Sequence, residues 1–322
     1  MRKLSLLSLT YAVESVVCAV KQDAMVKSPK LQNYVGEEYT PQYTSHPLFN
    51  GQCLYNDFEQ LENLGKGISS SVIKVRHQPT GKLAVFKTFT PFHINHHLDF
   101  IRNEEWILHE LEHPKIVNHY CTIARYPERE VIFVMELIEG QPLVDFVEDS
   151  GQRLSVERIV EVLAQLLAIT RYLHHHQVTH RDIKEGNIIL TPDGNIKLID
   201  FGLATIDSNN GLVKSFGAKG FGAPEKLCSF AKYGRSADYF SIGILGYVLA
   251  TGQFPDFLTY YRQLWGGSSI MLPKTGHDNL DLLLVVLTNP NGSHRWSTCY
   301  ENWDTIKSFS LFVNISWPEE YP

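Results

Sequence analysis

The stretch from Val178 to Gly202, VTHRDIKEGNIILTPDGNIKLIDFG, constrains the fold of this chain more than any other segment. Two short apolar runs, Ile188–Leu190 and Ile196–Ile199, flank a segment that contains Pro-Asp-Gly. This combination is typical of an antiparallel hairpin, because Gly readily adopts the positive φ that such a turn requires. A hairpin returns the chain to its starting point. We therefore expect Asn187, before the first strand, to lie beside Asp200, after the second.

Oxygen ligands at one end of a hairpin suit a hard cation such as Mg²⁺, which proteins bind through few side chains together with substrate phosphates. Asp182 precedes Asn187 in the same loop and can add a third side chain that faces the same space. The layout predicts phosphoryl transfer. An ordinary polar loop followed by a hairpin is the alternative, but it leaves the placement of Lys184 unexplained.

Two motifs in this stretch resemble the catalytic loop and the metal-binding loop of the eukaryotic-type protein kinases. They are His180-Arg181-Asp182 with Asn187, and Asp200-Phe201-Gly202. The resemblance implies that Asp182 accepts or orients the proton of the substrate hydroxyl, and that Lys184 neutralises charge on the transferred γ-phosphoryl. It also implies that Asn187 and Asp200 hold Mg²⁺. The Asp-x-Lys pattern is similar to that of serine/threonine kinases rather than tyrosine kinases.

Composition narrows the remaining function classes. The chain has 322 residues, a formal net charge of −6 and no long run of one sign, which disfavours binding of nucleic acid through its phosphates. No apolar run reaches the roughly 18 residues of a membrane span. The five cysteines are scattered, odd in number and without paired metal-ligand spacing, so we expect neither a disulfide framework nor a zinc site.

The N-terminal residues allow two interpretations. A basic start, the apolar run Leu4–Val13 and the small residues Val17-Cys18-Ala19 are compatible with a secretory signal over residues 1–19. Glu14 interrupts the apolar run, and an intracellular helix or a disordered leader has a similar sequence. We expect an intracellular protein, cytoplasmic or nuclear, with secretion as the alternative. Residues 21–51 show no periodicity, and we expect a poorly ordered extension there.

Three strands are expected next, at Phe58–Leu64, Val72–Val75 and Leu83–Phe89. The first two are joined by LGKGISSSV. Its glycines, Gly65 and Gly67, lack side chains, so that backbone amides could approach a triphosphate closely. The loop does not contain GxxxxGK[ST], which argues against a P-loop NTPase.

A lysine and a glutamate follow these glycines in order. Lys87 lies in an apolar strand and needs a carboxylate partner to offset the cost of desolvation. The predicted helix Phe100–Leu111 contains Glu104, the expected partner of Lys87, and Glu105 is the alternative partner. Together with Gly65-x-Gly67-x-x-Ser70-x-Val72, this order resembles the glycine loop, strand lysine and helix glutamate of the kinases. The resemblance places Lys87 on the α- and β-phosphates of ATP and pairs it with Glu104.

The strand Val131–Leu137 and the break after it resemble the kinase hinge, although an ordinary buried strand followed by a loop has the same pattern. The resemblance implies that backbone groups of Glu136 and Ile138 bind adenine between apolar side chains. The residues that it assigns to ATP binding are Leu64, Gly65, Gly67, Ser70, Val72, Val85, Lys87, Glu104, Met135, Glu136, Ile138 and Ile189.

Helices are expected in the second half of the chain. Ser155 can cap an amphipathic segment that runs to Leu173, and Leu280–Leu287 predicts another helix. His174, His175 and His176 end the first of these. Consecutive helical residues point in different directions, so we expect them to favour the negative helix C-terminus rather than to form a metal cluster.

Three further positions resemble structural residues of the kinase C-lobe. Asp238 corresponds to a buried aspartate that anchors the catalytic loop, and Glu225 and Arg295 to an ion pair within the lobe. The resemblance covers about residues 58–312. It implies an α+β, bilobal fold with a small, mostly antiparallel N-lobe containing one key helix, and a larger, mainly helical C-lobe. We assign residues 1–56 to an extension, 57–137 and 138–312 to the two lobes, and 313–322 to a tail.

The segment from Asp200 to Ala223-Pro224-Glu225 has the length of a kinase activation segment. Arg181 is the type of residue that pairs with a phosphate there. The candidate acceptors are Thr205, Ser208 and Ser215, although Lys214 occupies the position that aligns best with the usual phosphosite. We prefer Ser215.

These residues predict an ATP- and Mg²⁺-dependent serine/threonine protein kinase that acts on Ser or Thr hydroxyls of a protein substrate. The alternative is a pseudokinase, a scaffold that binds nucleotide or partners with little phosphotransfer. Ala218 favours it, because serine/threonine kinases usually carry Thr there; so does His119, where the family usually has an apolar residue. A small-molecule phosphotransferase fits the long activation segment less well. Gly186 and Val248 replace glutamates of arginine-directed members, so a basic target motif is not supported.

Overall fold

The computed structural model describes residues 39–67, 69–126, 128–148, 154–206, 220–227, 234–256 and 272–317. Several expectations fall outside these ranges. They concern the possible signal over residues 1–19, and Ser208, Lys214, Ser215 and Ala218 of the activation segment.

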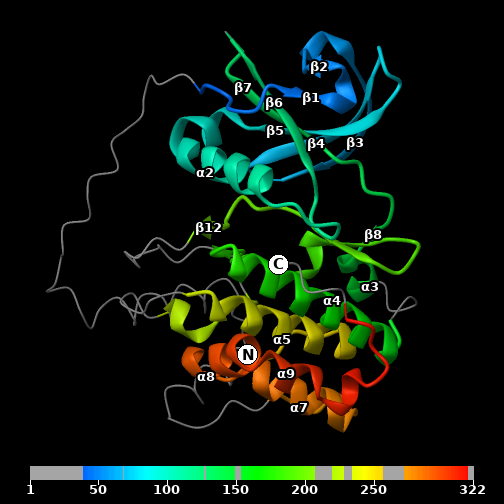
Figure 1. Cartoon of the computed structure of the whole chain (residues 1–322), viewed down its shortest axis with the longest axis vertical. Helices are drawn as coiled ribbons and strands as arrows, with labels where there is room; N and C mark the ends of the chain where they lie inside the picture. Colours follow the sequence, from blue (N-terminus) through cyan, green and yellow to red (C-terminus); the bar gives the residue numbers. More distant parts are fainter. Residues whose placement is uncertain are drawn as a thin grey trace, which may run out of the picture. The chain divides into compact units, whose positions relative to one another are not determined.

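A five-stranded antiparallel sheet with the order β3-β4-β5-β7-β6 forms the first large element (Figure 1). Its strands are β3 Phe58–Lys66, β4 Ser70–His77, β5 Leu83–Phe89, β6 His119–Arg125 and β7 Glu130–Met135. They overlap the predicted strands because apolar and β-branched residues favour a half-buried pleated surface. Gly81, with φ of 69°, closes the turn between β4 and β5, where its N–H donates to His77 O at 2.7 Å. The central position of β5 places Lys87 in the middle of the sheet.

Helix α2, Pro91–Glu110, packs against this sheet and buries Leu98, Ile101 and Leu108. A non-helical residue, His97 with φ of −138° and ψ of 30°, divides it by a kink, and the predicted helix from Phe100 lies in the part after the kink. The part before the kink, which the sequence did not predict, begins at Pro91, because Thr90 Oγ1 accepts from His93 N at 3.2 Å and proline fits the first helical position.

Residues 39–57, directly before the sheet, form short strands and turns, so the expectation of a poorly ordered extension is wrong for residues 39–51. The segment contains β1 Ser45–His46, η1 Pro47–Phe49, β2 Gly51–Gln52 and η2 Tyr55–Asp57. Strands β1 and β2 form a small hairpin through Asn50, which has φ of 60°. Phe49 is buried between Phe58 and His77. These aromatic contacts supply order where the sequence shows no periodicity.

A disulfide joins Cys53 to Cys121, with their Cα atoms 6.6 Å apart, which corrects the expectation of no disulfide. The two residues are separated by 68 positions, so no short spacing marks them as partners. Cys53 lies after β2 and Cys121 on β6, and both side chains are buried. The bond therefore attaches the N-terminal hairpin to the edge strand of the large sheet.

The predicted hairpin in the catalytic stretch consists of β10 Ile188–Leu190 and β11 Ile196–Leu198, with Ile188 opposite Leu198. Strand β8, Gln141–Pro142, extends this sheet in the order β11-β10-β8. A second small sheet pairs β9 Val178–Thr179 with β12 Thr205–Ile206. The single turn η3, Glu185–Asn187, precedes β10.

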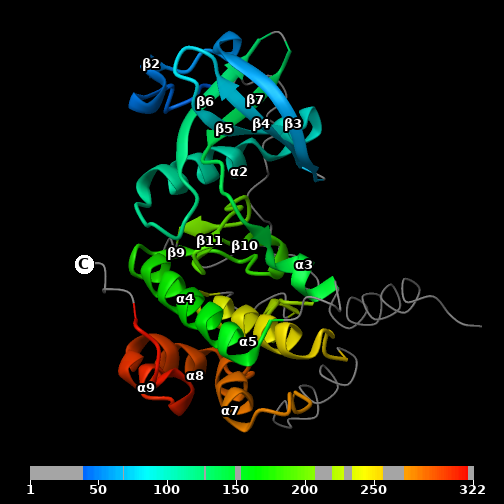
Figure 2. The ribbon, with the colours of Figure 1, turned by 90° about the vertical axis from the view of Figure 1, so that its right-hand side faces the viewer.

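Helices build most of the remaining structure. Helix α4, Val156–His175, lies beside α5, Ser236–Thr251 (Figure 2). Ser155 Oγ accepts from Arg158 N at 3.3 Å and so caps α4, as the sequence predicts. The other elements are α3 Leu143–Glu148, η4 Pro224–Leu227, α7 Asp278–Leu287, α8 Gly292–Trp296, η5 Ser297–Glu301, α9 Trp303–Lys307 and η6 Ser310–Phe312.

The fold is therefore of the α+β class, with an antiparallel sheet and one packed helix followed by a mainly helical part. Buried residues of α4 and α5 share one core cluster with those of α2 and β7. A second cluster lies under the N-terminal hairpin and includes Phe49, Phe58 and Phe86. Of the helices that the structure describes, none combines the length and apolar character that crossing a bilayer requires.

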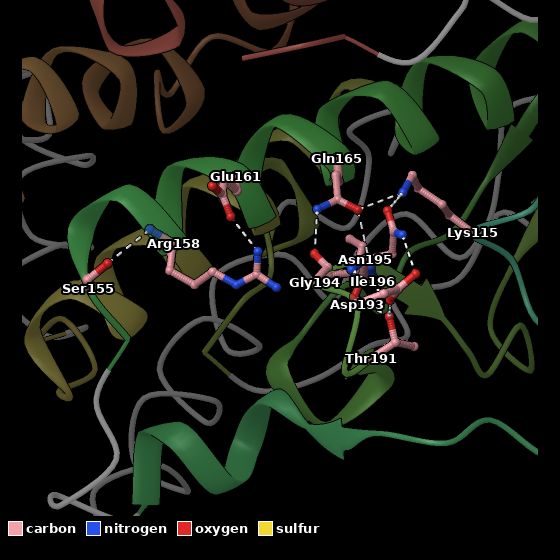
Figure 3. Close-up of polar contacts among 10 residues, drawn as sticks. All are labelled: Lys115, Ser155, Arg158, Glu161, Gln165, Thr191, Asp193, Gly194, Asn195 and Ile196. Atoms are coloured by element: carbon pink, nitrogen blue, oxygen red, sulfur yellow. Dashed lines mark hydrogen bonds and ion pairs between the residues drawn. The ribbon is translucent and has the colours of Figure 1, made fainter. Parts of the chain in front are cut away.

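A polar network fixes the turn of the β10–β11 hairpin to α4 (Figure 3). The Gln165 side chain accepts from Lys115 Nζ at 2.8 Å and from Ile196 N at 3.1 Å, and it donates to Gly194 O at 3.2 Å. Gly194 has φ of 88°, and a Cβ there would lie 2.9 Å from the guanidinium of Arg158. The turn thus depends on glycine for its conformation, whereas the Arg158 guanidinium is the mobile end of a long side chain.

Replacing Gln165 tests this network. We expect Gln165→Ala to lower the free energy of unfolding by about 1–3 kcal/mol, because the Ile196 N–H loses its acceptor. Gln165→Glu is the matched variant: it keeps both acceptor contacts and loses only the donor to Gly194 O, so its loss should be smaller. Urea unfolding measures both, and equal stability of Gln165→Ala and the parent would contradict the assignment.

Candidate active site

Three charged side chains meet where the sheet, α2 and the β10–β11 hairpin come together. Lys87 Nζ on β5 lies 2.6 Å from Glu104 Oε1 on α2 and 2.9 Å from Asp200 Oδ1 after β11. The structure thus brings together three predicted site residues that are far apart in sequence. Glu104, rather than its rival Glu105, contacts the lysine.

Lys87 and Asp200 stabilise each other's charge, whereas burial, and then the neighbouring Asp200 carboxylate, raise the pKa of Glu104 despite its contact with Lys87. Burial alone would lower the pKa of Lys87, but the carboxylates of Asp200 and Glu104 outweigh it, and the pKa lies above its ordinary value. Lys87 in turn holds the pKa of Asp200 well below its ordinary value. Near neutral pH the lysine is therefore an ammonium and the aspartate a carboxylate. A buried lysine with two acidic partners is suited to holding anionic oxygens.

The catalytic-loop residues form a second group. Lys184 Nζ donates to Asp182 Oδ2 at 2.7 Å, and Asn187 Nδ2 donates to the same oxygen at 2.9 Å. Asn187 Nδ2 also lies 2.9 Å from Asp182 O, and Ile199 N donates to Asn187 O at 2.9 Å. These contacts fix the orientation of Asp182 and connect its loop to the end of β11, directly before Asp200.

A buried aspartate anchors this loop from α5. Asp238, with no exposed surface, accepts from His180 N at 2.9 Å and from Arg181 N at 2.8 Å. Its Oδ2 also lies 2.9 Å from His174 Nε2. Burial acts to raise the pKa of Asp238, but the contacts with His174, His180 and Arg181 outweigh it and lower that pKa.

Sequence reasoning missed this role of His174, which it assigned to the polar end of the helix. His174 is fully buried, whereas His175 and His176 are exposed. A usable signal existed: His174 continues the buried face of α4 that includes Leu167 and Thr170. Among the residues that the structure describes, no three His, Cys, Asp or Glu side chains are grouped to hold a metal by themselves.

The predicted hinge residues lie at the end of β7 and after it. Met135 is buried and lies opposite Val85 on β5. Glu136 N donates to Asn118 O at 2.9 Å, and the Glu136 carboxylate contacts Lys197 at 2.7 Å. Val72 on β4 lies opposite Lys87 on β5. Ser70, at the start of β4, is buried.

The chain after the hinge touches the hairpin closely. Gly140 has φ of 158°, and a Cβ there would lie 2.5 Å from Leu190 O and 2.7 Å from Ile189 Cγ2. The close approach of Gly140 to the backbone of Leu190 therefore requires glycine at this position. It brings the hinge next to Ile189 of β10, while Ile138 is partly buried against the main core. Ile138 and Ile189, both predicted to bind ATP, thus lie close to the backbone that follows β7.

The glycine loop lies at the exposed end of β3 and β4. Gly65 N donates to Asn63 Oδ1 at 3.0 Å, and Gly67 N donates to Ser70 O at 2.8 Å. Leu64 is 46% exposed. A Cβ on Gly65 would meet no described atom within 4 Å, so packing within the chain does not explain this glycine.

Helix α2 also contacts the loop after β11 directly. Asn103 Nδ2 donates to Ala204 O at 2.7 Å. A Cβ on Gly202 would lie 3.2 Å from Asp200 Oδ1 and 3.4 Å from Glu104 Oε2, so a larger residue would crowd both carboxylates. The Phe201 ring lies edge-on to His180 at a centroid distance of 4.7 Å. The positions of α2 and of this loop are therefore linked.

The remaining predicted residues lie in the helical part and the activation segment. Arg295 is fully buried; it pairs with Glu225 and donates from Nε to Ser236 O at 3.0 Å. Thr205 on β12 lies opposite Thr179. Arg181 is 3% exposed, and the preferred phosphoacceptor Ser215 lies outside the described residues.

His119, the residue that departs from the usual apolar type, is buried on β6. Burial, and then the nearby His109, lower the pKa of His119 to about 3. Its Nε2 lies 2.9 Å from Thr122 Oγ1, and its ring lies edge-on to Phe133. Near neutral pH the side chain is therefore an uncharged ring that packs as an aromatic group.

The low pKa of His119 predicts acid sensitivity. The unfolded chain, with a histidine pKa near 6.5, binds a proton that the folded chain excludes down to about pH 3. Stability should therefore fall as pH falls through this window, by about 2 kcal/mol between pH 6.5 and 5. We expect His119→Leu to remove this contribution in urea unfolding at the two pH values. The exposed His175→Leu is the control, and an unchanged pH slope in His119→Leu would contradict the prediction.

Comparison with known proteins gives a family. Residues 58–263 match the family model described as protein kinase domain. Protein kinase 3 of Dictyostelium discoideum is 29% identical over 280 residues, covering 81% of this chain and 30% of that protein. NUAK family SNF1-like kinase 2 of Homo sapiens is 29% identical over 258 residues, with coverages of 76% and 40%. Probable serine/threonine-protein kinase MARK-B of Dictyostelium discoideum is 32% identical over 242 residues, with coverages of 74% and 33%. The chain thus spans less than half the length of these relatives. It belongs to the protein kinase family.

Proposed function

We propose that this chain is a serine/threonine protein kinase that uses ATP and Mg²⁺. The observation that carries the proposal is the position of Lys87 Nζ, held by carboxylates of α2 and of the segment after β11. Such a lysine is charged, buried and fixed in direction. Several curated relatives are named as serine/threonine kinases, which supports the same reaction.

The phosphate-binding part of the proposal rests on this lysine and on the glycine loop. Lys87 binds the α- and β-phosphates, and Glu104 fixes the direction of its ammonium. The open space around the Cβ position of Gly65 suits the approach of a phosphate to the backbone. Gly65 N and Gly67 N donate within the loop in the present structure, so nucleotide binding requires the loop to rearrange.

Asn187 and Asp200 are the residues that would hold Mg²⁺. The carboxylate of Asp200 and the amide oxygen of Asn187 are hard donors, and few protein ligands suffice when phosphates complete the coordination. Their loops are tied together through Ile199 N and Asn187 O. Bound Mg²⁺ supplies positive charge that neutralises the phosphates.

The catalytic part of the proposal assigns two roles in one hydrogen-bonded group. Asp182 accepts or orients the proton of the substrate hydroxyl, and Asn187 Nδ2 keeps the carboxylate in a fixed orientation. Lys184, in contact with Asp182, stabilises negative charge on the transferred phosphoryl group. The substrate hydroxyl belongs to Ser or Thr of a protein, which is consistent with the Asp-x-Lys pattern.

Adenine binding is assigned to the backbone after Met135. The Glu136 N–H donates to Asn118 O, so the carbonyl of Glu136 and backbone groups of Ile138 are the partners for the base. Val72, Val85 and Ile189 supply apolar surface on either side. The close approach of Gly140 to Leu190 O fixes the backbone that follows.

Substitution of Asp182 tests the reaction. We expect Asp182→Asn, nearly isosteric with the parent residue, to lower kcat by about 10²–10⁴-fold, the usual contribution of a general base. The assay follows transfer of labelled phosphate from ATP with Mg²⁺ to generic protein substrates. Asp304→Asn is the matched control, because its side chain is almost fully exposed and remote from these groups. Equal transfer by Asp182→Asn and the parent would remove the kinase proposal, and nucleotide binding without transfer would favour a pseudokinase.

The Cys53–Cys121 disulfide bears on the compartment of the protein. Disulfides persist mainly in oxidising compartments, so this bond supports export rather than the intracellular location favoured above. We expect the mature chain isolated from its source to start near Val20 and to retain this disulfide. N-terminal sequencing and thiol titration measure both, and an intact Met1 with reduced Cys53 would support an intracellular enzyme.

A further inference from the structure

We infer that residues 39–53, here called the N-terminal brace, hold α2 in the position in which Glu104 pairs with Lys87. Tyr39 and Glu105 are the positioning residues. The inference rests on the proposed kinase function for its consequence in catalysis. The brace lies before residue 58, where the match to the kinase family model begins.

The first observation is a buried hydrogen bond between the brace and α2. Tyr39 OH donates to Glu105 Oε2 at 2.5 Å, and the two residues are 2% and 1% exposed. Burial and the neighbouring Glu105 carboxylate raise the pKa of Tyr39, so its hydroxyl keeps the proton that it donates. A buried carboxyl group is costly without a donor, and Tyr39 provides one.

The second observation is the sequence position of this contact. Glu105 directly follows Glu104, and neighbouring side chains on a helix point about 100° apart. One glutamate is bound to Lys87 and the other to Tyr39. A rotation of α2 about its axis would break both contacts, so the bond at Tyr39 opposes the movement that separates Glu104 from Lys87.

The third observation is the attachment of the brace to β6 and to Tyr126 directly after it, which gives the brace a fixed base. Thr122 N donates to Tyr43 O at 2.6 Å, and Tyr126 OH donates to Tyr39 O. The disulfide from Cys53 joins the other end of the brace to β6. The Tyr43 ring stacks on His109 in the last turn of α2, with centroids 3.4 Å apart. The brace therefore connects an edge of the sheet to the helix at two points.

Helix α2 has a second polar contact, through Asn103, with the backbone of Ala204. The brace and the metal-binding loop thus contact the helix through residues on either side of Glu104. Loss of the brace leaves the Asn103 contact and the Lys87 ion pair to position the helix. We therefore expect partial rather than complete loss of alignment.

The test uses the full chain with Tyr39→Phe, which removes one hydroxyl and keeps the ring. Tyr55→Phe is the matched control, because among the residues that the structure describes Tyr55 OH accepts a hydrogen bond from the exposed Gln60 alone. The first measurement is amide hydrogen exchange of residues 98–110 without nucleotide. The second is the set of kcat, KM for ATP and KM for the protein substrate, taken well below the melting temperature.

We expect Tyr39→Phe to speed exchange in residues 98–110 and to lower kcat/KM for ATP, each by about tenfold, the effect of losing a hydrogen bond to a buried carboxylate. The KM for the protein substrate should not change. Tyr55→Phe should behave as the parent. A role in stability alone would lower the melting temperature and leave kcat/KM for ATP unchanged, and that result overturns the inference.

Two further variants separate the contributions of the bond and of the attachment. A double-mutant cycle of Tyr39→Phe with Glu105→Gln should be non-additive in α2 exchange, whereas Tyr55→Phe with Glu105→Gln should be additive. Cys53→Ala releases one end of the brace without touching β6. It should change exchange and kcat/KM in the same direction, and a thiol reductant should then affect the parent but not this variant.

The outcomes for the inference and for the proposed function are distinct. If the parent transfers phosphate and Tyr39→Phe matches it in both measurements, the inference fails and the function stands. If the parent transfers no phosphate, the function fails, and α2 exchange decides the positioning role by itself. Additive behaviour of Tyr39 and Glu105 in the cycle overturns the inference in either case.

Discussion

The ammonium of Lys87 between Glu104 and Asp200 is the interaction on which the rest of this structure depends. Each partner belongs to a different element: the central strand of the sheet, helix α2, and the segment after β11. A buried charge is stable only with such partners, since an isolated ammonium would be expensive to desolvate. The three elements are thus connected by one cluster, and displacement of β5 would leave both carboxylates without their ammonium partner.

Backbone strain near this cluster is balanced by specific contacts. Arg181 and Asp200 have φ of 69° and 61°, a region that non-glycine residues enter at a cost of about 1–3 kcal/mol each. The N–H of Arg181 is held by the buried Asp238, and Asp200 is held by Lys87 and by Gly202 N. Both strained residues border the proposed catalytic groups, and Asp238 on α5 holds the backbone of one of them from outside the proposed substrate contacts.

Local signals were enough to predict the elements of the site, whereas long-range pairings were not. The β10–β11 hairpin was predicted to within a residue, since the Pro-Asp-Gly turn and its flanking strands are adjacent in sequence. The part of α2 after its kink at His97 was predicted, whereas the turns before the kink were not, because they are rich in His and polar residues. His174 was misplaced because three consecutive histidines were treated as one polar group. Its continuation of the buried face of α4 would have separated it from the other two.

The ordered segment before the sheet could not be predicted for a physical reason. Its contacts join residues far apart in sequence, such as Tyr39 with Glu105 and Cys53 with Cys121, which are 66 and 68 positions apart. Short strands, aromatic contacts and a single pair of cysteines leave no periodicity.

The loop that the Cys53–Cys121 disulfide closes contains β3, β4, β5 and α2, and therefore both Lys87 and Glu104. Closing a loop of 68 residues lowers the conformational entropy of the unfolded chain. In the chain-entropy description this stabilises the folded state by about 4 kcal/mol. A protease that cuts once inside this ring, for example at the exposed glycine loop, therefore releases no fragment. The nicked molecule keeps its full mass and both members of the ion pair until its sulfur bridge is reduced.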